Sequence, residues 1–166
     1  VSTMLYLTRT SHPLVLDVKP DATGGSYHFT ADSGLPDCPQ LKMVRINGSL
    51  FFGAIDHVQR SLEEIDERNP AQKHVLIVAS GVNFIDMAGA GMLLHEAQRR
   101  RRLGGNLYFY RLKDQARQYL RRSGYDKEIG EENIFPVKSP VVQNIYRNLD
   151  SDICRNCTAR IFRECH

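Results

Sequence analysis

The stretch VLIVASGVNFIDMAGAGMLL, residues 75–94, decides the fold. It opens within a short continuous apolar run, residues 74–79, that is rich in Val and Ile and typical of a central strand buried on both faces. After a loop at residues 80–85, Asp86 can cap a helix that ends at Gly104-Gly105. The stretch therefore predicts a strand, a loop and a helix in direct succession.

The segments on either side alternate between strand and helix patterns. Residues 41–46 alternate apolar and polar side chains up to the turn pair Asn47-Gly48, which predicts a strand. Apolar residues then recur at helical spacing over residues 55–65, and Asn69-Pro70 must stop that helix. Further patterns predict a strand at 107–110, a helix at 114–122, and a last helix with Ser139 as N-cap and Pro140 at its first position.

This alternation predicts an α/β domain with a mixed, mostly parallel central sheet flanked by about four helices. Two short extended pieces, at residues 14–18 and 26–30, add a more antiparallel N-terminal portion. We divide the chain into a linker with the first strands (1–40), a core (41–150) and a cysteine-containing C-terminal tail (151–166).

Length and composition limit the classes of protein to consider. A chain of 166 residues with 42% hydrophobic residues suits one domain, and a net charge of +3 gives no sign of nucleic-acid binding. The longest apolar run, residues 75–79, is far shorter than the roughly 18 residues of a membrane helix, so we expect that this chain does not cross a bilayer by itself. Because it starts at Val1 without a signal-peptide pattern, we expect a processed product or a piece of a longer protein.

The strand-loop-helix stretch resembles the signature of STAS domains, in which a buried strand leads through a loop into an Asp-Ser-Ser-Gly-type helix start. Here that start reads Asp86-Met87-Ala88-Gly89. STAS domains occur as bacterial anti-sigma-factor antagonists and as the C-terminal cytoplasmic domains of SulP anion transporters. The resemblance implies a single STAS-like domain over about residues 5–150.

A second set of residues separates these two families. The long lead-in over residues 5–20, the stretch Gly24-Gly25-Ser26-Tyr27 and above all VRINGSLFFGAI at residues 44–55 resemble the entry of a SulP STAS domain. In the antagonists the second serine of the signature is phosphorylated, and Ala88 stands at that position here, with Met87 at the first. Neither side chain can accept phosphate, so the resemblance favours the transporter family.

The resemblance implies a regulatory and docking domain of a bacterial SulP-type transporter of sulfate, bicarbonate or a related anion. It would lie at the cytoplasmic face of the inner (plasma) membrane and contact the transmembrane domain of the same protein. A cytosolic protein and a second copy of the chain are further expected partners. Because no set of nucleophile, base and orienting residue stands out, we do not expect an enzyme. The alternatives are a freestanding STAS signalling protein and a metal- or redox-sensing module.

The helix start is the candidate partner-binding surface, formed by Asp86, Met87, Ala88, Gly89 and Gly91. Asp86 can satisfy a free backbone N–H, and the two glycines keep the first turn bare. A bare turn allows another backbone, a partner or an anion to approach closely. We favour close helix packing as the reason for the glycines and hold docking as a hypothesis.

The last residues hold a candidate metal or redox cluster. Cys154, Cys157 and Cys165, with the final His166, supply four donors of the kinds that Zn²⁺ binds. A Cys-x2-Cys pair also suits iron-sulfur or redox chemistry. However, the adjacent Cys165 and His166 cannot easily bind one ion together. We therefore expect no cofactor and favour a plain amphipathic tail in a reducing cytosol.

Arg99, Arg100, Arg101 and Arg102 form a candidate basic patch, to which Arg121 and Arg122 add. Such a patch can face anionic lipid headgroups or acidic loops of a transporter. The four consecutive arginines are also explained by attraction to the dipole of the helix C-terminus, with their charges otherwise solvated, and we favour this explanation slightly.

Overall fold

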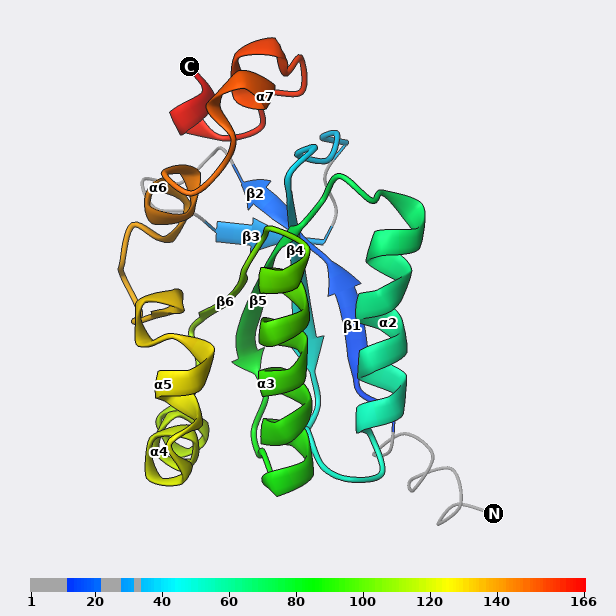
Figure 1. Ribbon diagram of the computed structural model, residues 1–166, viewed down its shortest axis with the longest axis vertical. Helices are drawn as coiled ribbons and strands as arrows, with labels where there is room; N and C mark the ends of the chain where they lie inside the picture. The colour runs from blue at the N-terminus through cyan, green and yellow to red at the C-terminus, as the bar shows by residue number, and fades with distance from the viewer. Residues whose placement is uncertain (1–11, 22–27, 32–33) are drawn as a thin grey trace.

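The structure is a computed structural model of the chain, and it describes residues 12–21, 28–31 and 34–166. Its centre is a five-stranded sheet in the order β1-β4-β5-β6-β7, in which β1 is antiparallel to β4 and the other pairs are parallel (Figure 1). The predicted mixed, mostly parallel sheet is confirmed. Its strands are β1 (Leu14–Asp17), β4 (Leu41–Asn47), β5 (His74–Gly81), β6 (Leu107–Tyr110) and β7 (Ile134–Phe135).

The middle strand of the sheet is β5, as its sequence predicts. It pairs with β4 on one side and with β6 on the other, and residues 74–79 are buried. Val75 and Ile77 belong to the apolar layer on one face, whereas Leu76 and Val78 belong to the layer on the other. A strand that is covered on both faces needs apolar side chains at every position, which explains the continuous run.

Helices cover one face of the sheet, and a small hairpin with short helices covers the other (Figure 1). The first layer comprises α2 (Ile55–Arg68), α3 (Met87–Arg102), α4 (Asp114–Ser123) and α5 (Tyr125–Ile129). The second comprises the antiparallel pair β2 (Lys19–Asp21) and β3 (His28–Thr30), α6 (Val141–Tyr146) and the segment with α7 (Ser151–Asn156). Within the described part of the chain, no helix combines the length and apolar character that crossing a membrane requires.

The expected number of about four flanking helices was too low, because the described residues form six α-helices. The four predicted helices correspond to α2, α3, α4 and α6. The helix α5 follows α4 directly through Gly124, whose φ of 76° is left-handed, and it has only five residues. The helix α7 has six. Both are short and, unlike the equally short α6, have no Ser-Pro signal at their start.

Two local predictions near the ends of the sheet also differ from the structure. Ser139 is not an N-cap, because α6 begins at Val141 with Pro140 in the cap position, and the Ser139 Oγ is buried without a hydrogen-bond partner among the described residues. The left-handed Lys138 (φ 70°) turns the chain just before it. The extended piece at 26–30 is confirmed only as β3, since residues 26 and 27 lie outside the described residues, and β2 was not predicted.

The C-terminal segment, residues 151–166, packs onto the domain and extends its second layer. The buried Gln40 holds the start of this segment, because its Nε2 donates to the Asp150 carbonyl at 3.0 Å and its Oε1 accepts from the Asp150 N–H at 2.8 Å. Phe162 is buried in the same apolar layer as Leu76, and a short 3-10 turn, Arg163–Cys165, ends the chain. The segment therefore belongs to the folded unit.

A buried polar pair lies at the amino end of β5. His74 Nδ1 is 3.0 Å from the Tyr108 hydroxyl, which also accepts a hydrogen bond from Asn148 Nδ2 at 3.3 Å. Because that hydroxyl accepts from Asn148, it can donate its proton to a neutral His74. Burial lowers the pKa of His74, and the charges of Arg100 and Lys73 lower it further. The folded domain thus favours an uncharged imidazole.

We expect this histidine to make the domain less stable in mild acid. Its folded pKa lies below the ordinary value of 6.5, so the unfolded chain binds the proton more readily. The contribution of His74 to the free energy of unfolding is fully present above pH 6.5 and is lost as pH falls toward and through the lowered pKa that His74 has in the folded domain. For one titrating group the loss is at most about 1.4 kcal/mol per pH unit. Urea unfolding between pH 7.5 and about 5 checks this, since that range lies above ordinary carboxyl pKa values. In a His74→Gln variant the slope should shrink, and an unchanged slope would refute the assignment.

Candidate functional site

The predicted helix start is tied to a neighbouring loop by one carboxylate. Asp86 Oδ1 accepts from the Gly89 N–H at 2.8 Å, which confirms Asp86 as the N-cap of α3. Its Oδ2 accepts from the Phe52 N–H at 3.0 Å, a contact that the sequence did not predict. Both oxygens are therefore engaged within the chain, and Asp86 acts as a structural link between α3 and the loop before α2.

The two glycines of the first turn have different roles. A Cβ at Gly89 would lie 2.3 Å from the Leu50 carbonyl oxygen, so only glycine lets the two backbones approach this closely. The Leu50 N–H donates to the Phe84 carbonyl at 2.8 Å, and the Leu50 carbonyl accepts from the Asp86 N–H at 3.0 Å. A Cβ at Gly91 would meet no heavy atom within 4 Å. Packing thus explains Gly89 but does not explain Gly91.

The helix start lies at the carboxyl edge of the sheet, by which we mean the edge where β4, β5 and β6 end. The loops after β4 and β5 meet there through the pairing of Leu50 with Ile85. The antiparallel β1 begins at the same edge, because Leu14 pairs with Asn47. Figure 1 shows this edge at the bottom of the molecule and the C-terminus at the opposite end. The described chain therefore enters the domain beside its candidate docking surface.

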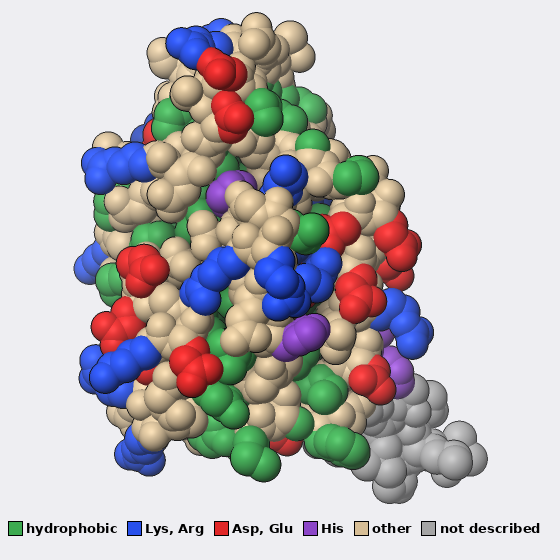
Figure 2. Space-filling view, in the orientation of Figure 1, with side chains coloured by type: hydrophobic (Ala, Val, Ile, Leu, Met, Phe, Trp, Pro, Cys, Tyr) green, Lys and Arg blue, Asp and Glu red, His purple; other side chains and the backbone are tan. Residues whose placement is uncertain are grey.

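Large apolar side chains are exposed at this edge. Phe52 is 79% exposed and Met87 is 73% exposed, and Phe84 is also exposed. We call these three residues the apolar surface; Figure 2 shows hydrophobic side chains gathered along the corresponding lower end of the molecule. Of the five predicted partner-binding residues, Met87 belongs to it, Ala88 and Gly91 are half-buried, and Gly89 is buried. Phe52 and Phe84 were not predicted as site residues, although the unusual Phe51-Phe52 pair was a signal in the sequence.

The predicted basic patch at the end of α3 is wrong for two of its four arginines. Arg100 is 0% exposed: its Nε donates to Glu96 at 2.8 Å and its Nη1 to Asp66 of α2 at 2.6 Å. Arg99 pairs with the same two carboxylates. Carboxylates on α3 and on the adjoining α2 hold both guanidinium groups, so the two arginines join the helices, with Arg100 fully buried and Arg99 half-buried.

The other two arginines of the run have separate surroundings. Arg101 donates to the Glu128 carbonyl at 2.8 Å and to the Ile129 carbonyl, which are at the end of α5. Arg102 is exposed. The four consecutive arginines therefore do not act as one surface.

The candidate metal or redox cluster of the tail consists of free thiols. All four are free thiols, and among the described residues, which include every cysteine, no group of three His, Cys, Asp or Glu residues could hold a metal ion. Cys154 accepts from Gln40 Nε2 at 3.2 Å, and its pKa is raised by burial and by the nearby Cys165. A raised pKa keeps the thiol protonated and makes it a weaker nucleophile.

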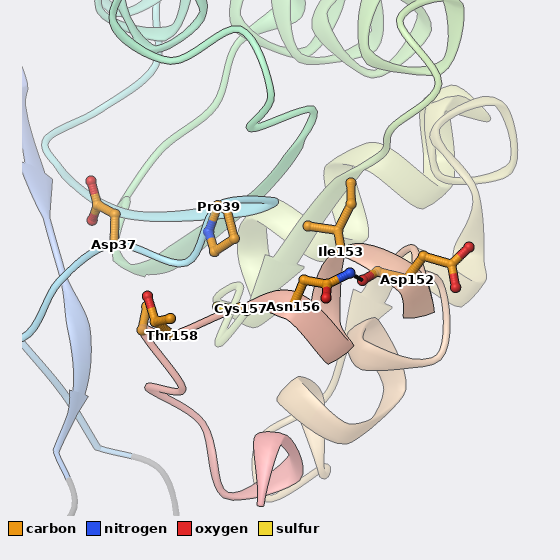
Figure 3. Close-up of a pocket in the computed structure, with 8 residues that line it drawn as sticks. Asp37, Pro39, Asp152, Ile153, Asn156, Cys157 and Thr158 are labelled. Carbon is orange, nitrogen blue, oxygen red and sulfur yellow. Dashed lines mark hydrogen bonds between the residues drawn. The ribbon is translucent and has the colours of Figure 1, made fainter.

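A cavity of about 530 Å³ opens beside this segment (Figure 3). Its two carboxylates, Asp37 and Asp152, lie at opposite sides, with Pro39 and Ile153 between them. Asp37 pairs with Lys19 and Lys42 at 3.1 Å each, and Asp152 pairs with Arg155. Because both acids are neutralised by cations of the chain and stand apart, the cavity offers no arrangement for acid–base chemistry.

Comparison with known families agrees with this geometry. A sequence model of the STAS domain family matches residues 35–146. The chain belongs to the STAS domain family. The buried strand β5, the Asp86-capped α3 and residues 44–55, which carried much of the resemblance, lie within the matched residues, whereas the lead-in over residues 5–20 and residues 24–27 precede them.

Proteins similar to this STAS domain include a named transporter in sequence and two solved structures in fold. A Bacillus subtilis (strain 168) protein named "Putative sulfate transporter YvdB" is 30% identical over 97 residues, which are 58% of this chain and 18% of that protein. The structure of SLC26A9 superposes with a TM-score of 0.76 over 91% of this chain and 27% of that chain, at 13% identity. The structure of the anti-sigma factor antagonist SpoIIAA in its unphosphorylated form superposes with a TM-score of 0.54 over 68% of this chain and 93% of that chain, also at 13% identity. The two structures show the same fold, and this domain spans a small part of YvdB and SLC26A9.

Proposed function

We propose that this STAS domain is the cytoplasmic regulatory and docking domain of a SulP-type anion transporter and acts by protein contact without catalysis. Its partner would be the transmembrane domain of the same longer protein. The sequence similarity to YvdB supports a relation to transporters. The apolar surface of Phe52, Phe84 and Met87, placed where the described chain enters the domain, is the observation that carries the docking proposal.

The position of that surface supports contact with a preceding domain. A segment that leads into β1 arrives at the carboxyl edge, so a preceding domain would be connected to this STAS domain at that edge. Exposed Phe and Met side chains at one edge are typical of a surface that is covered in an assembly. Contact there would regulate transport if it were stronger in one conformation of the membrane domain than in another.

The polar groups near this surface support a docking role more than a catalytic one. Asp86 uses both carboxylate oxygens in hydrogen bonds to backbone N–H groups of the chain. The helix start has no serine or threonine, because Met87 and Ala88 follow Asp86. These residues therefore cannot be phosphorylated at the helix start. This favours a transporter domain over a freestanding anti-sigma-factor antagonist that is switched by phosphorylation there.

The test measures binding of this STAS domain to the purified transmembrane part encoded by the same reading frame. A Phe52→Ser/Met87→Ser variant should bind at least about tenfold more weakly, because each fully buried side chain of this size contributes roughly 1.5–3 kcal/mol. Leu103→Ser is the matched control, since Leu103 is an exposed apolar residue just after α3, at the opposite end of that helix.

Two results would contradict the proposal. Equal affinity of the double variant and the Leu103→Ser control would remove the apolar surface as the docking site. A reading frame that encodes no membrane-spanning segments before this domain would remove the transporter itself and would favour the freestanding signalling protein.

A further inference from the structure

A second surface at the carboxyl edge is basic and lies on α4. The segment of residues 113–122 holds four cations and one anion. Arg117, Arg121 and Arg122 are exposed, and in the part of the chain that the structure describes none of them forms an ion pair. We call these three residues the α4 basic face. Lys113 is engaged separately, since its Nζ donates to Asn83 Oδ1.

The anchoring of α4 keeps these arginines directed outward. Ala116 and Leu120 bury the inner side of the helix in the apolar layer under α3. Gly124, in the left-handed conformation, ends the helix directly after the arginines. The side chains at the helical positions opposite Ala116 and Leu120 must therefore face solvent or a partner.

The acidic groups near the α4 basic face are too few to neutralise it. Arg117 and Arg121 share a hollow with Asp126 and Glu131. Asp126 is buried and its Oδ1 accepts from the Lys127 N–H at 2.9 Å, so only Glu131 is an exposed acid there. By contrast, α2 on the other side of the molecule carries five acidic residues and two arginines. The positive charge is thus local to one side of the carboxyl edge.

The basic face adjoins exposed aromatic surface. Arg122 and Phe84 line the same small hollow, together with Tyr119 and Gln118. Figure 1 places α4 at the lower end of the molecule, level with the start of α3. Met87, the first residue of α3, is exposed. Arginines beside exposed aromatic and Met side chains form the combination by which peripheral proteins bind anionic bilayers, with cations at the headgroups and apolar groups just below them.

We propose that the α4 basic face binds the surface of a bilayer that contains anionic phospholipid. This contact goes beyond docking onto a protein partner and does not depend on it. It would hold the carboxyl edge against the headgroups, in the orientation that brings the entering chain and the apolar surface to the membrane.

Vesicle sedimentation of the whole chain tests the proposal directly. The chain should bind vesicles with about one third phosphatidylglycerol in phosphatidylcholine and should not bind phosphatidylcholine alone. Binding should disappear at about 0.5 M salt, because salt screens exposed charges. An Arg117→Gln/Arg121→Gln/Arg122→Gln variant should bind the anionic vesicles on the order of 100-fold more weakly, because each basic residue contributes a factor of roughly five to the partition coefficient.

The matched control removes the same charge from the other end of the molecule. Arg68 and Arg102 are the last residues of α2 and α3, Arg147 follows the end of α6, and all three are exposed, so the Arg68→Gln/Arg102→Gln/Arg147→Gln variant should keep nearly all binding. Equal loss in both triple variants would show attraction by net charge alone and would overturn the proposal, as would equal binding to both kinds of vesicle. Binding to the transmembrane part in neutral detergent reports on the proposed function separately, because no anionic lipid is present.

Discussion

Replacing Arg100 by methionine is expected to lower the free energy of unfolding by about 3–5 kcal/mol. Arg100 is fully buried and bonds Glu96, Asp66 and the carbonyls of Gln72 and Leu62. Without the charge of Arg100, the carboxylates of Glu96 and Asp66 would share Arg99 as their one cation. One negative charge would then be uncompensated at a site where Glu96 is only 1% exposed. Urea unfolding followed by circular dichroism measures the loss.

Two further variants separate a broken ion-pair network from a general loss of packing. Glu96→Leu combined with Arg100→Met leaves the Arg99–Asp66 pair balanced, so the double variant should lose less than the sum of the two single variants. Arg102→Met, in the same last turn but exposed, should change stability by less than about 0.5 kcal/mol. If Arg100→Met behaved like Arg102→Met, the network would not contribute to stability.

Gly89→Ala is expected to destabilise the domain by about 3 kcal/mol, through overpacking and a weakened helix cap. The new methyl group would lie 2.3 Å from the Leu50 carbonyl oxygen, which belongs to backbone and cannot rotate away. The start of α3 would then have to move off the loop, and the bond from the Gly89 N–H to Asp86 would lengthen.

Gly91→Ala, two residues further along, provides the matched control. Nothing lies within 4 Å of a Cβ there, and alanine is the better helix former, so this variant should be more stable than the wild type by about 0.5–1 kcal/mol. Thermal or urea unfolding of both variants gives the comparison. Similar stabilities would mean that α3 and the loop are not packed as closely as the structure shows. If Gly91→Ala is more stable yet binds the transmembrane part more weakly, docking would explain why a glycine occupies an open helical position.

The sequence predicted the central parts of the fold because they follow from local patterns. A continuous apolar run, an Asp before a helical pattern and an Asn-Pro stop each have one dominant physical cause, and β5, the N-cap Asp86 and the end of α2 were all predicted. The short elements α5 and α7 were missed because, unlike α6, they have no Ser-Pro signal at their start. The candidate site was predicted only in part, since Met87 lies in it but Phe52 and Phe84 come from loops that the sheet brings together.

The arginine run shows the limit most clearly. In the sequence, residues 99–102 are four equal cations in the last turn of a helix. Whether such a side chain is solvated or buried depends on which helix packs beside it, and here Asp66 of α2 packs against α3 and binds Arg99 and Arg100 together with Glu96. The same holds for Gly89, whose neighbour Leu50 is almost forty residues earlier in the chain.

The sequence by itself determined the α/β class, the buried middle strand, the Asp86-capped helix and the absence of a hydroxyl group at that helix start. Tertiary structure alone decided which charges are free, which apolar side chains are exposed at one edge, and where the entering chain lies relative to them. The physical reason is that propensity, capping and periodicity act over a few neighbouring residues, whereas burial and charge pairing depend on residues brought together by the sheet.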